Sequence, residues 1–307
     1  MIASTVELTA VDARGKLNLK ISRVTFDAGN GSILAIVGAP RDGTSLLFDV
    51  IDGTALPKAG SVRAPERARI ARVTLDAPLP DMLRVDEVCA LSAALRGGKA
   101  GDALAPLYLE SLAKRSVRSL STDERRAVTL AVALASATAD VLLVEEPLAM
   151  LAPLATRVVA DALREKAKAA CVIVTTSSPR DATRVGDRIA VLVDGVLTPI
   201  EESNTVSNEA GSLRVVVAAS QGKTGAAALI GALGREDAVG RVESTAFAAG
   251  AATALTVHGD DLGALAKAVT RAIAEAKIDV DLVEPSIMPL DLIRAQIAAH
   301  AAAGART

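Results

Sequence analysis

Two short apolar runs constrain the fold of this chain more than any other feature of its sequence. Residues 141–144 (VLLV) and 171–174 (CVIV) contain no charged or amide side chain, and polar residues bound each run. This pattern is typical of strands buried on both faces, as in parallel sheets covered by helices. Residues 156–169, between the two runs, have the apolar spacing of a helix. The strand–helix–strand order predicts an α/β fold with a largely parallel sheet.

The same alternation of strand-like and helix-like segments extends over residues 1–200. Asp194-Gly195 separates two strand-like runs and predicts a hairpin turn. A polar segment, residues 201–212 (EESNTVSNEAGS), is typical of a linker. After it the segments follow the order β-α-β-β-α-β, the ferredoxin-like arrangement, and residues 289–300 add one more helix-like segment. We therefore expect an α/β domain, a linker, and a small α+β domain over residues 213–307.

Composition excludes several classes of protein. Lys and Arg number 34 against 36 Asp and Glu, so the chain is not broadly basic and we expect no nucleic-acid partner. The longest apolar stretch, residues 128–144, is interrupted by polar side chains and falls short of the roughly 20 apolar residues that span a bilayer. Residues 1–16 lack the features of a signal peptide, and two cysteines cannot form a disulfide framework. We expect a soluble, cytoplasmic chain that reaches a membrane only through a partner.

Two groups of arginines are candidates for surface features. Arg125 and Arg126 open a helix-like segment, and we expect them on its solvated face. A second group, expected at the outer surface or at a contact with a partner, comprises Arg63, Arg67, Arg69 and Arg72. Neither His258 nor His300 has sequence neighbours that suit a metal site, so the sequence predicts no metal role for them.

Residues 33–47 (ILAIVGAPRDGTSLL) contain the most informative motif of the chain. An apolar run leads into a glycine-bounded loop and then into a helix, with the spacing Gly38-x4-Gly43-Thr44-Ser45. This is the spacing of a P-loop, which cradles phosphates with backbone N–H groups at a helix N-terminus. Thr44 stands where a P-loop has lysine, whereas Ser45 keeps the hydroxyl that binds Mg²⁺ there. The loop alone is equally compatible with an ordinary strand–turn–helix.

Further motifs follow this loop along the chain. They are residues 120–126 (LSTDERR), 140–147 (DVLLVEEP), 172–177 (VIVTTS) and 187–195 (DRIAVLVDG). In this order and at these intervals, they make residues 1 to about 200 resemble an ATP-binding-cassette (ABC) ATPase. The family signature Leu-Ser-Gly-Gly-Gln maps onto residues 120–124, and its Asp-Glu-Pro maps onto Glu145-Glu146-Pro147. The resemblance implies a P-loop ABC-type ATPase fold, followed by the small ferredoxin-like domain.

The resemblance also implies roles for individual residues. ATP and Mg²⁺ are the ligands of the family, with Ser45 on the metal and Glu146 as the catalytic glutamate. Glu145 stands in place of an aspartate that is one methylene shorter. The resemblance assigns nucleotide binding to Gly38, Gly43, Thr44, Ser45, Glu145, Ser121 and Thr176.

Several positions depart from the family's pattern in ways that remove chemistry. Thr44 replaces the loop lysine, Leu75 the glutamine that senses the γ-phosphate, and Thr176 the switch histidine. Thr122 and Asp123 replace the signature glycines, and a carboxylate there repels phosphate. The missing lysine contact and the missing adenine-stacking aromatic together cost about 2.5–6 kcal/mol, or about 10²- to 10⁴-fold in affinity. We expect weak ATP binding and impaired or lost hydrolysis.

Residues 274–293 (AEAKIDVDLVEPSIMPLDLI) resemble the closing motif of drug-, heme- and sodium-exporter ATPases. This resemblance implies an exporter-like complex at the cytoplasmic face of the inner or plasma membrane, with membrane-spanning ABC permease subunits and a homo- or heterodimer of cassettes. Two alternatives remain at this point. One is a nucleotide-free scaffold or regulatory pseudo-ATPase that pairs with an active cassette. The other is an active but unconventional ATPase that uses Gly38, Gly43, Ser45, Glu145 and Glu146.

Overall fold

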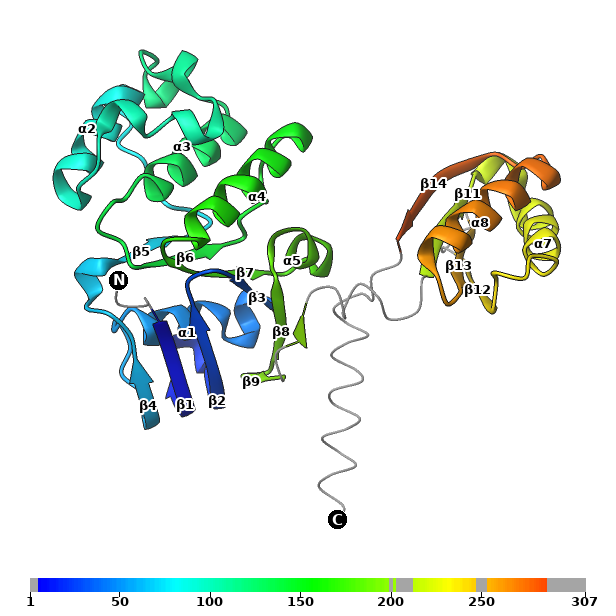
Figure 1. The fold of residues 1–307 in the computed structure, drawn as a ribbon, viewed down its shortest axis with the longest axis horizontal. Coiled ribbons are helices and arrows are strands. Elements are labelled where there is room, and N and C mark those ends of the chain that lie inside the picture. Colours follow the sequence, from blue (N-terminus) through cyan, green and yellow to red (C-terminus); the bar gives the residue numbers. More distant parts are fainter. Residues whose placement is uncertain (1–4, 199–200, 203–211, 247–252, 286–307) are drawn as a thin grey trace. The chain divides into compact units, whose positions relative to one another are not determined.

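The structure is a computed structural model that describes residues 5–198, 201–202, 212–246 and 253–285. Residues 5–202 belong to one compact unit and residues 212–285 to a second, each described here by itself (Figure 1). The helix predicted over residues 289–300 and the last part of the exporter-like motif lie outside the described residues. Within the described part of the chain, no helix combines the length and the apolar character that crossing a membrane requires.

A seven-stranded sheet forms the centre of the first unit, with the order β10-β8-β3-β7-β6-β5 and with β9 paired to β8. Its parallel strands are β3 (Ile33–Val37), β5 (Ile70–Val73), β6 (Val141–Glu145), β7 (Cys171–Thr176) and β8 (Arg188–Val193). Every residue of β3 and β7 is buried, because both faces of the sheet are covered. The predicted α/β fold with a largely parallel sheet is confirmed.

Two short antiparallel strands extend the sheet beside β8. β9 (Val196–Leu197) folds back on β8 across Asp194-Gly195, which confirms the predicted hairpin. β10 (Glu201–Glu202) also pairs with β8. The linker predicted over residues 201–212 was therefore wrong at both ends, since its first two residues lie in β10 and Ser212 begins another strand. Strand pairing uses backbone N–H and C=O groups, so a polar sequence can extend a sheet edge.

One face of the parallel sheet is covered by a second sheet and by α1 (Thr44–Ile51) (Figure 1). The second sheet is antiparallel with the order β2-β1-β4, and its strands are β1 (Thr5–Arg14), β2 (Lys20–Gly29) and β4 (Ala59–Arg63). Leu47 and Phe48 of α1 are fully buried in the core that these elements share with β3, β6 and β7. The helix that follows the glycine-bounded loop is thus fixed between two sheets.

The opposite face carries the remaining helices of the unit (Figure 1). They are α2 (Val85–Arg96), α3 (Thr122–Leu134), α4 (Pro153–Ala167) and α5 (Pro179–Val185). Short 3₁₀ turns lie at Lys16–Asn18, Pro40–Asp42, Arg67–Arg69, Ala100–Asp102, Ala105–Leu107, Glu110–Leu112 and Val117–Ser119. α3 starts after Ser121, whose hydroxyl accepts from the Glu124 N–H (3.4 Å) while the Glu124 carboxylate accepts from the Ser121 N–H (2.9 Å). This capping box fixes where the helix begins.

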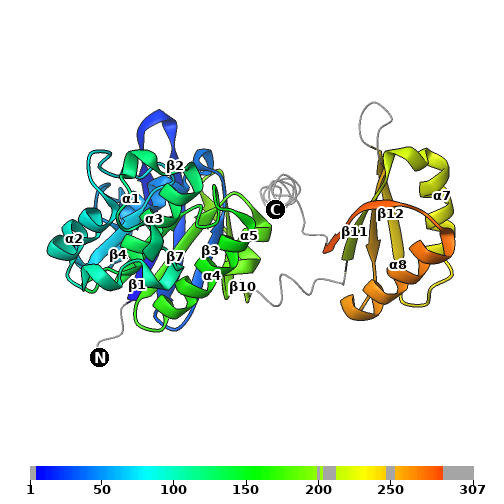
Figure 2. The same ribbon diagram turned by 90° about the horizontal axis from the view of Figure 1, so that it is seen from above.

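The second unit has its own core. Its elements are β11 (Ser212–Val217), a 3₁₀ turn at Ala219–Gln221, α7 (Gly222–Leu233), β12 (Arg241–Ala246), β13 (Thr253–His258), α8 (Leu262–Ala276) and β14 (Val280–Pro285). The strands form an antiparallel sheet with the order β12-β13-β11-β14. Alternate residues of β11 are buried, and α7 and α8 lie side by side against them (Figure 2). One face of this sheet therefore packs on the two helices.

Candidate functional site

The glycine-bounded loop of residues 38–45 joins the carboxyl end of β3 to α1. The Gly38 N–H donates to the carbonyl of Thr176, 2.9 Å away, and so connects the loop to the end of β7. Gly43 has a φ of +100°, in the left-handed region that favours glycine, and a Cβ there would lie 2.9 Å from the carbonyl oxygen of Lys20. The predicted strand–loop–helix is present, and its backbone requires a glycine at position 43.

Three backbone N–H groups of this loop bond within the loop itself. The Ala39 N–H donates to Asp42 Oδ2 at 2.7 Å, and the Asp42 N–H donates to the Ala39 carbonyl at 2.9 Å. The Gly43 N–H donates to the carbonyl of Pro40 at 3.1 Å, and Pro40 has no N–H to offer. A phosphate cradle instead points such N–H groups at its ligand. The loop is closed by its own hydrogen bonds.

Two buried side chains also make the loop unsuited to phosphate. The Asp42 side chain is 2% exposed and brings a negatively charged group into the turn. Thr44 is 4% exposed, and its Cγ2 methyl lies 3.0 Å from the position that a Cβ on Gly38 would take. Ser45, which the resemblance assigns to Mg²⁺, is half-buried. A carboxylate and a methyl group thus stand where a triphosphate needs cationic partners.

Glu145, at the end of β6, is bound by an arginine from the neighbouring strand. Arg72 Nη2 donates to Glu145 Oε1 at 2.7 Å, and Arg72 Nη1 donates to Asp49 Oδ1 at 2.6 Å and to Asp52 Oδ2 at 3.2 Å. Burial by itself lowers the pKa of the Arg72 guanidinium, but its hydrogen bonds to Asp49 and Glu145 together raise that pKa above its ordinary value. The arginine is permanently charged, and it neutralises part of a cluster of three carboxylates.

The placement of Arg72 corrects a prediction. Arg72 does not belong to a surface cluster, because its side chain is only 18% exposed and lies over the ring of Phe48, 5.7 Å from the ring centroid. Arg63 and Arg69 do lie at the surface, where they form separate ion pairs with Glu7 and Asp140. The sequence missed Arg72 because a single arginine within a short apolar strand gives no indication of its distant partners.

Glu146 follows directly and has both carboxylate oxygens bonded. Thr176 Oγ1 donates to Glu146 Oε2 at 2.8 Å, and the Ser177 N–H donates to Glu146 Oε1 at 2.7 Å. Glu146 has a φ of +46°, a conformation that costs a residue other than glycine about 1–3 kcal/mol and that its neighbours must hold in place. The structure thus brings together two of the predicted site residues, Glu146 and Thr176, at the ends of β6 and β7.

Arg126 was predicted to be solvated, and that prediction was wrong. Its side chain lies in the interior with the residue 3% exposed, and it donates to three backbone carbonyls: Thr74 (2.8 Å), Glu145 (2.6 Å) and Glu146 (2.9 Å). Burial lowers the pKa of Arg126. The sequence did contain an indication of this burial, since the spacing places Arg126 on the same face of α3 as Leu130 and Leu134, which are both buried. Arg126 holds the chain beyond β5 and the end of β6 in position.

Ser121 is placed apart from the loop. It is exposed at the start of α3, where its Oγ donates to Asp123 Oδ1 at 2.5 Å, and this bond lowers the pKa of the Asp123 carboxyl. In the described part of the chain, Ser121 has no hydrogen bond to residues 38–45. Leu75, in the turn after β5, has an apolar side chain without a metal-binding atom. These positions therefore add no ligand group to the site at residues 38–45.

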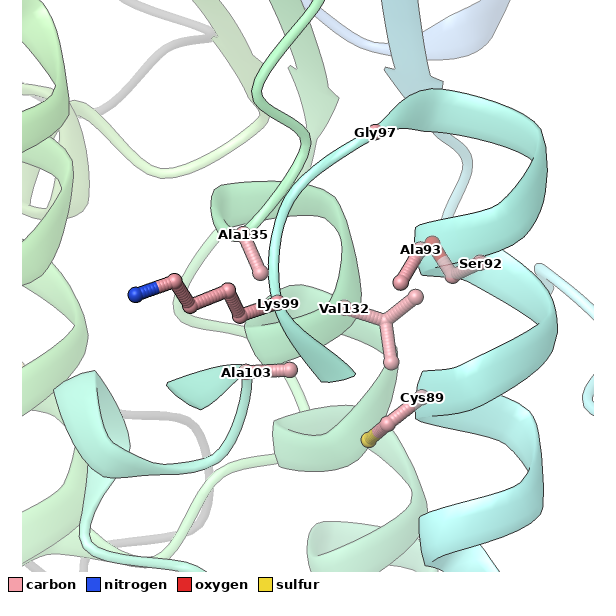
Figure 3. A pocket seen from close by; sticks show the side chains of 8 residues that line it. All are labelled: Cys89, Ser92, Ala93, Gly97, Lys99, Ala103, Val132 and Ala135. Atoms are coloured by element: carbon pink, nitrogen blue, oxygen red, sulfur yellow. The ribbon is translucent and has the colours of Figure 1, made fainter. Parts of the chain in front are cut away.

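A small cavity lies away from this site, between α2, α3 and the turn at Gly97 (Figure 3). Its volume is about 10 Å³, which suits one water molecule at most. Cys89 and Val132 point into it, whereas the Lys99 side chain extends away from α2 (Figure 3). Burial raises the pKa of the Cys89 thiol, so the group stays protonated and inert. The cavity is a packing feature and not a ligand site.

Comparison with known proteins connects this geometry to a family. A family model described as "ABC transporter" matches residues 21–149. The aliphatic sulfonates import ATP-binding protein SsuB 3 of Paraburkholderia xenovorans (strain LB400) is 32% identical over 196 residues, which cover 61% of this chain and 78% of that protein. The chain belongs to the ABC transporter family. Its fold is the mixed α/β P-loop fold of ABC ATP-binding subunits.

Other relatives agree with this assignment. The molybdenum import ATP-binding protein ModC of Mycobacterium tuberculosis (strain H37Rv) is 30% identical over 225 residues, which cover 64% of this chain and 59% of ModC. The chain therefore spans little more than half the length of such relatives. The structure of cbiO1 from Clostridium perfringens, part of the ABC transporter complex cbiONQ, has a TM-score of 0.60 at 19% identity and covers 67% of this chain and 92% of that one. At this identity the likeness shows the fold alone.

The ABC transporter family as a whole implies ATP and Mg²⁺, so the fit of this site to Mg²⁺-ATP can be tested. The N–H groups of Ala39, Asp42 and Gly43 are bonded within the loop, Asp42 places a carboxylate in the loop, and Thr44 supplies no cation. Glu145 is paired with Arg72, and both oxygens of Glu146 accept hydrogen bonds from the chain. In the described residues, no group of three or more His, Cys, Asp or Glu side chains is arranged to hold a metal ion, and the carboxylates of Asp49, Asp52 and Glu145 are arranged around Arg72 instead. The residues present do not fit Mg²⁺-ATP.

Proposed function

We propose that the chain is a nucleotide-binding-type subunit of an ABC transport complex and that it does not hydrolyse ATP by itself. The observation that supports this most directly is the closed loop, in which N–H groups of Ala39, Asp42 and Gly43 bond to the loop's own oxygens. A nucleotide would have to break these bonds before it could use the N–H groups. The Asp42 carboxylate would also repel its phosphates.

Missing contacts act in the same direction as the closed loop. Hydrogen bonds that involve a charged group contribute about 1.5–3 kcal/mol each, so the loss of the lysine at Thr44 weakens binding by about 10- to 150-fold. Hydrolysis further requires stabilisation of the charge on the γ-phosphate. Glu146 already accepts one hydrogen bond on each oxygen, from Thr176 and Ser177, and these bonds fix the directions in which its remaining lone pairs could orient a water molecule. The proposed lack of autonomous hydrolysis follows from the missing lysine and from the missing stabilisation of charge on the γ-phosphate.

The proposed partners are membrane-spanning permease subunits and a second cassette. Through them the chain would lie at the cytoplasmic face of the inner or plasma membrane. The alternative proposal is a nucleotide-free scaffold or regulatory pseudo-ATPase that pairs with an active cassette, and the closed loop is compatible with it as well. Asp123, at the start of α3, is compatible with both proposals, because a carboxylate in the signature region repels a partner's phosphate.

The exporter direction is a finer proposal. It rests on the β-α-β-β-α-β order of the second unit, which we propose is a ferredoxin-like domain, and on the motif of residues 274–293, of which 274–285 are described. SsuB 3 and ModC are named as import proteins. Co-purification of the full chain with its permease and the direction of cargo transport by that complex in vesicles would decide between export and import.

The test of the proposed function is Mg²⁺-ATP binding by calorimetry, together with phosphate release, on purified chain. We expect no binding up to millimolar nucleotide and no turnover. A double variant, Asp42→Ser with Thr44→Lys, removes the carboxylate and supplies the missing cation, and we expect it to gain measurable binding. Arg41→Gln is the matched control, because Arg41 is an exposed residue of the same loop. Micromolar binding with turnover by the wild-type chain would overturn the proposal.

A further inference from the structure

The Arg72 guanidinium lies at the centre of a cluster that joins three elements of the first unit. Its Nη1 bonds to Asp49 and Asp52, one within α1 and one directly after it, and its Nη2 bonds to Glu145 of β6. Nη2 also lies 3.4 Å from the carbonyl oxygen of Ser45 in the first turn of α1. A planar guanidinium offers its donors as a fixed fork, so one side chain can serve all these acceptors at once.

Three of the four charged side chains in this cluster are largely buried, which strengthens the interactions between them. The side chains of Arg72, Glu145 and Asp52 are 18%, 15% and 8% exposed. Charges screened so little by water interact strongly, and removing one partner leaves the others uncompensated. Without the arginine, three carboxylates would face one another in a partly buried site. The cluster therefore needs a cation, and the chain supplies one of its own.

The family assigns a different cation to this position. Mg²⁺ in nucleotide sites is bound through one or two carboxylates, water molecules and substrate phosphates. Here the Oε1 atom of Glu145 already accepts from Arg72, and a divalent cation beside it would be repelled by the guanidinium. Glu145 and Arg72 together do not fit Mg²⁺.

We propose that Arg72 is a built-in replacement for the divalent cation at Glu145, and that it makes the arrangement of α1, β5 and β6 independent of Mg²⁺ and of nucleotide. Arg72 is a positioning residue in this inference, since it touches no substrate. The inference deepens the proposed function and rests on it for its meaning in a transport complex. A cassette in which α1, β5 and β6 keep the same arrangement with or without nucleotide is suited to a structural role in a transport complex.

The test is the melting temperature of the full chain in EDTA and in MgCl₂, for wild type and for Arg72→Met. Met keeps much of the volume over Phe48 and removes the charge. We expect the wild type to melt at the same temperature in both solutions. Arg72→Met should melt about 5–10 °C lower in EDTA, because three carboxylates lose their counter-ion. MgCl₂ should restore at least about half of that loss, whereas NaCl at the same ionic strength should not, because only a specifically bound ion stabilises by mass action.

Arg69→Met is the matched control, since Arg69 belongs to the same arginine-rich segment but pairs with Asp140 at the surface. It should show little loss and no effect of Mg²⁺. If Arg72→Met does not fold, Mn²⁺ binding to wild type and to Arg72→Gln, followed by water-proton relaxation, takes its place. The charged guanidinium should exclude Mn²⁺ in the wild type, and the neutral amide should admit it.

Three outcomes would overturn the inference: a wild-type melting temperature that rises with Mg²⁺, an Arg72→Met variant that melts like wild type, or a loss that Mg²⁺ does not specifically restore. In the Mn²⁺ experiment, binding by wild type, or equal exclusion by Arg72→Gln, would overturn it. ATP turnover by a wild type whose melting temperature ignores Mg²⁺ would instead refute the proposed function and leave the inference about Arg72 standing. The two failures are therefore distinguishable.

Discussion

Replacing Arg126 by methionine should destabilise the first unit far more than the same change at the adjacent Arg125. Arg126 lies in the interior and donates to the carbonyls of Thr74, Glu145 and Glu146. Arg125 lies closer to solvent, where it pairs with Asp81. The two variants remove the same side chain from neighbouring positions of one helix, so helix propensity and unfolded-state effects largely cancel between them.

The magnitude follows from the contacts. Three hydrogen bonds from a charged donor contribute about 1.5–3 kcal/mol each, or about 4.5–9 kcal/mol together. Arg126→Met also removes the cost of burying a guanidinium, which is several kcal/mol. The net loss is therefore about 3–5 kcal/mol, a large part of the total stability of an ordinary domain. For Arg125→Met, the loss of a partly exposed ion pair and of one hydrogen bond to the Val117 carbonyl, 3.2 Å long, costs about 1 kcal/mol.

Urea unfolding followed by circular dichroism checks this prediction. With a slope of about 3 kcal/mol per molar urea, Arg126→Met should lower the midpoint by about 1–2 M and Arg125→Met by less than about 0.4 M. A wild-type midpoint for Arg126→Met would refute the reasoning, because it would mean that the three carbonyls find other partners at no cost. A shift of the same size in both variants would refute it as well.

Three further predictions concern single residues. Burial raises the pKa of the Cys171 thiol to about 12, so iodoacetamide at pH 8 should label it only after the chain is unfolded, as mass spectrometry would show. Hydrogen bonds from Lys114 and Arg84 lower the pKa of the Asp86 carboxyl from 3.8 to about 2, so its contribution to stability is complete above about pH 4 and is lost as the pH falls towards 2. The difference in urea midpoint between wild type and Asp86→Asn should therefore shrink over that range. Gly43→Ala should lower the melting temperature by several degrees, because the new Cβ would lie 2.9 Å from a carbonyl oxygen and φ is +100°. Gly53→Ala is the control: nothing lies within 4 Å of the new Cβ and φ is +75°, so we expect a smaller decrease that reflects only the backbone strain.

Features set by neighbouring residues were predictable from the sequence. The apolar runs at residues 141–144 and 171–174 became β6 and β7, and the spacing of the loop placed it between a strand and a helix. The helix-like segment predicted at Arg125 and Arg126 became α3, whose start is fixed by the Ser121–Glu124 capping box. These features depend on contacts a few residues apart, which a sequence pattern records directly.

The site was predicted less completely. The family motifs located Gly38, Gly43, Glu145 and Glu146 at the ends of buried strands, because the carboxyl ends of parallel strands meet at one edge of a sheet. The hydrogen-bond partners of these residues could not be predicted from the sequence. Whether a loop N–H faces a ligand or its own chain depends on the turn that the backbone adopts, and here a 3₁₀ turn was formed.

The sequence by itself determined the family, the alternation of buried strands and helices, and the absence of the loop lysine at Thr44, because each is written in residue identity and short-range spacing. Only the tertiary structure decided that Arg72 meets Glu145 from 73 positions away and that Arg126 lies in the interior. The physical reason is that a charged side chain can be buried only where the fold supplies opposite charges or carbonyl oxygens. Those partners come from strands that are distant in the chain and adjacent in the sheet.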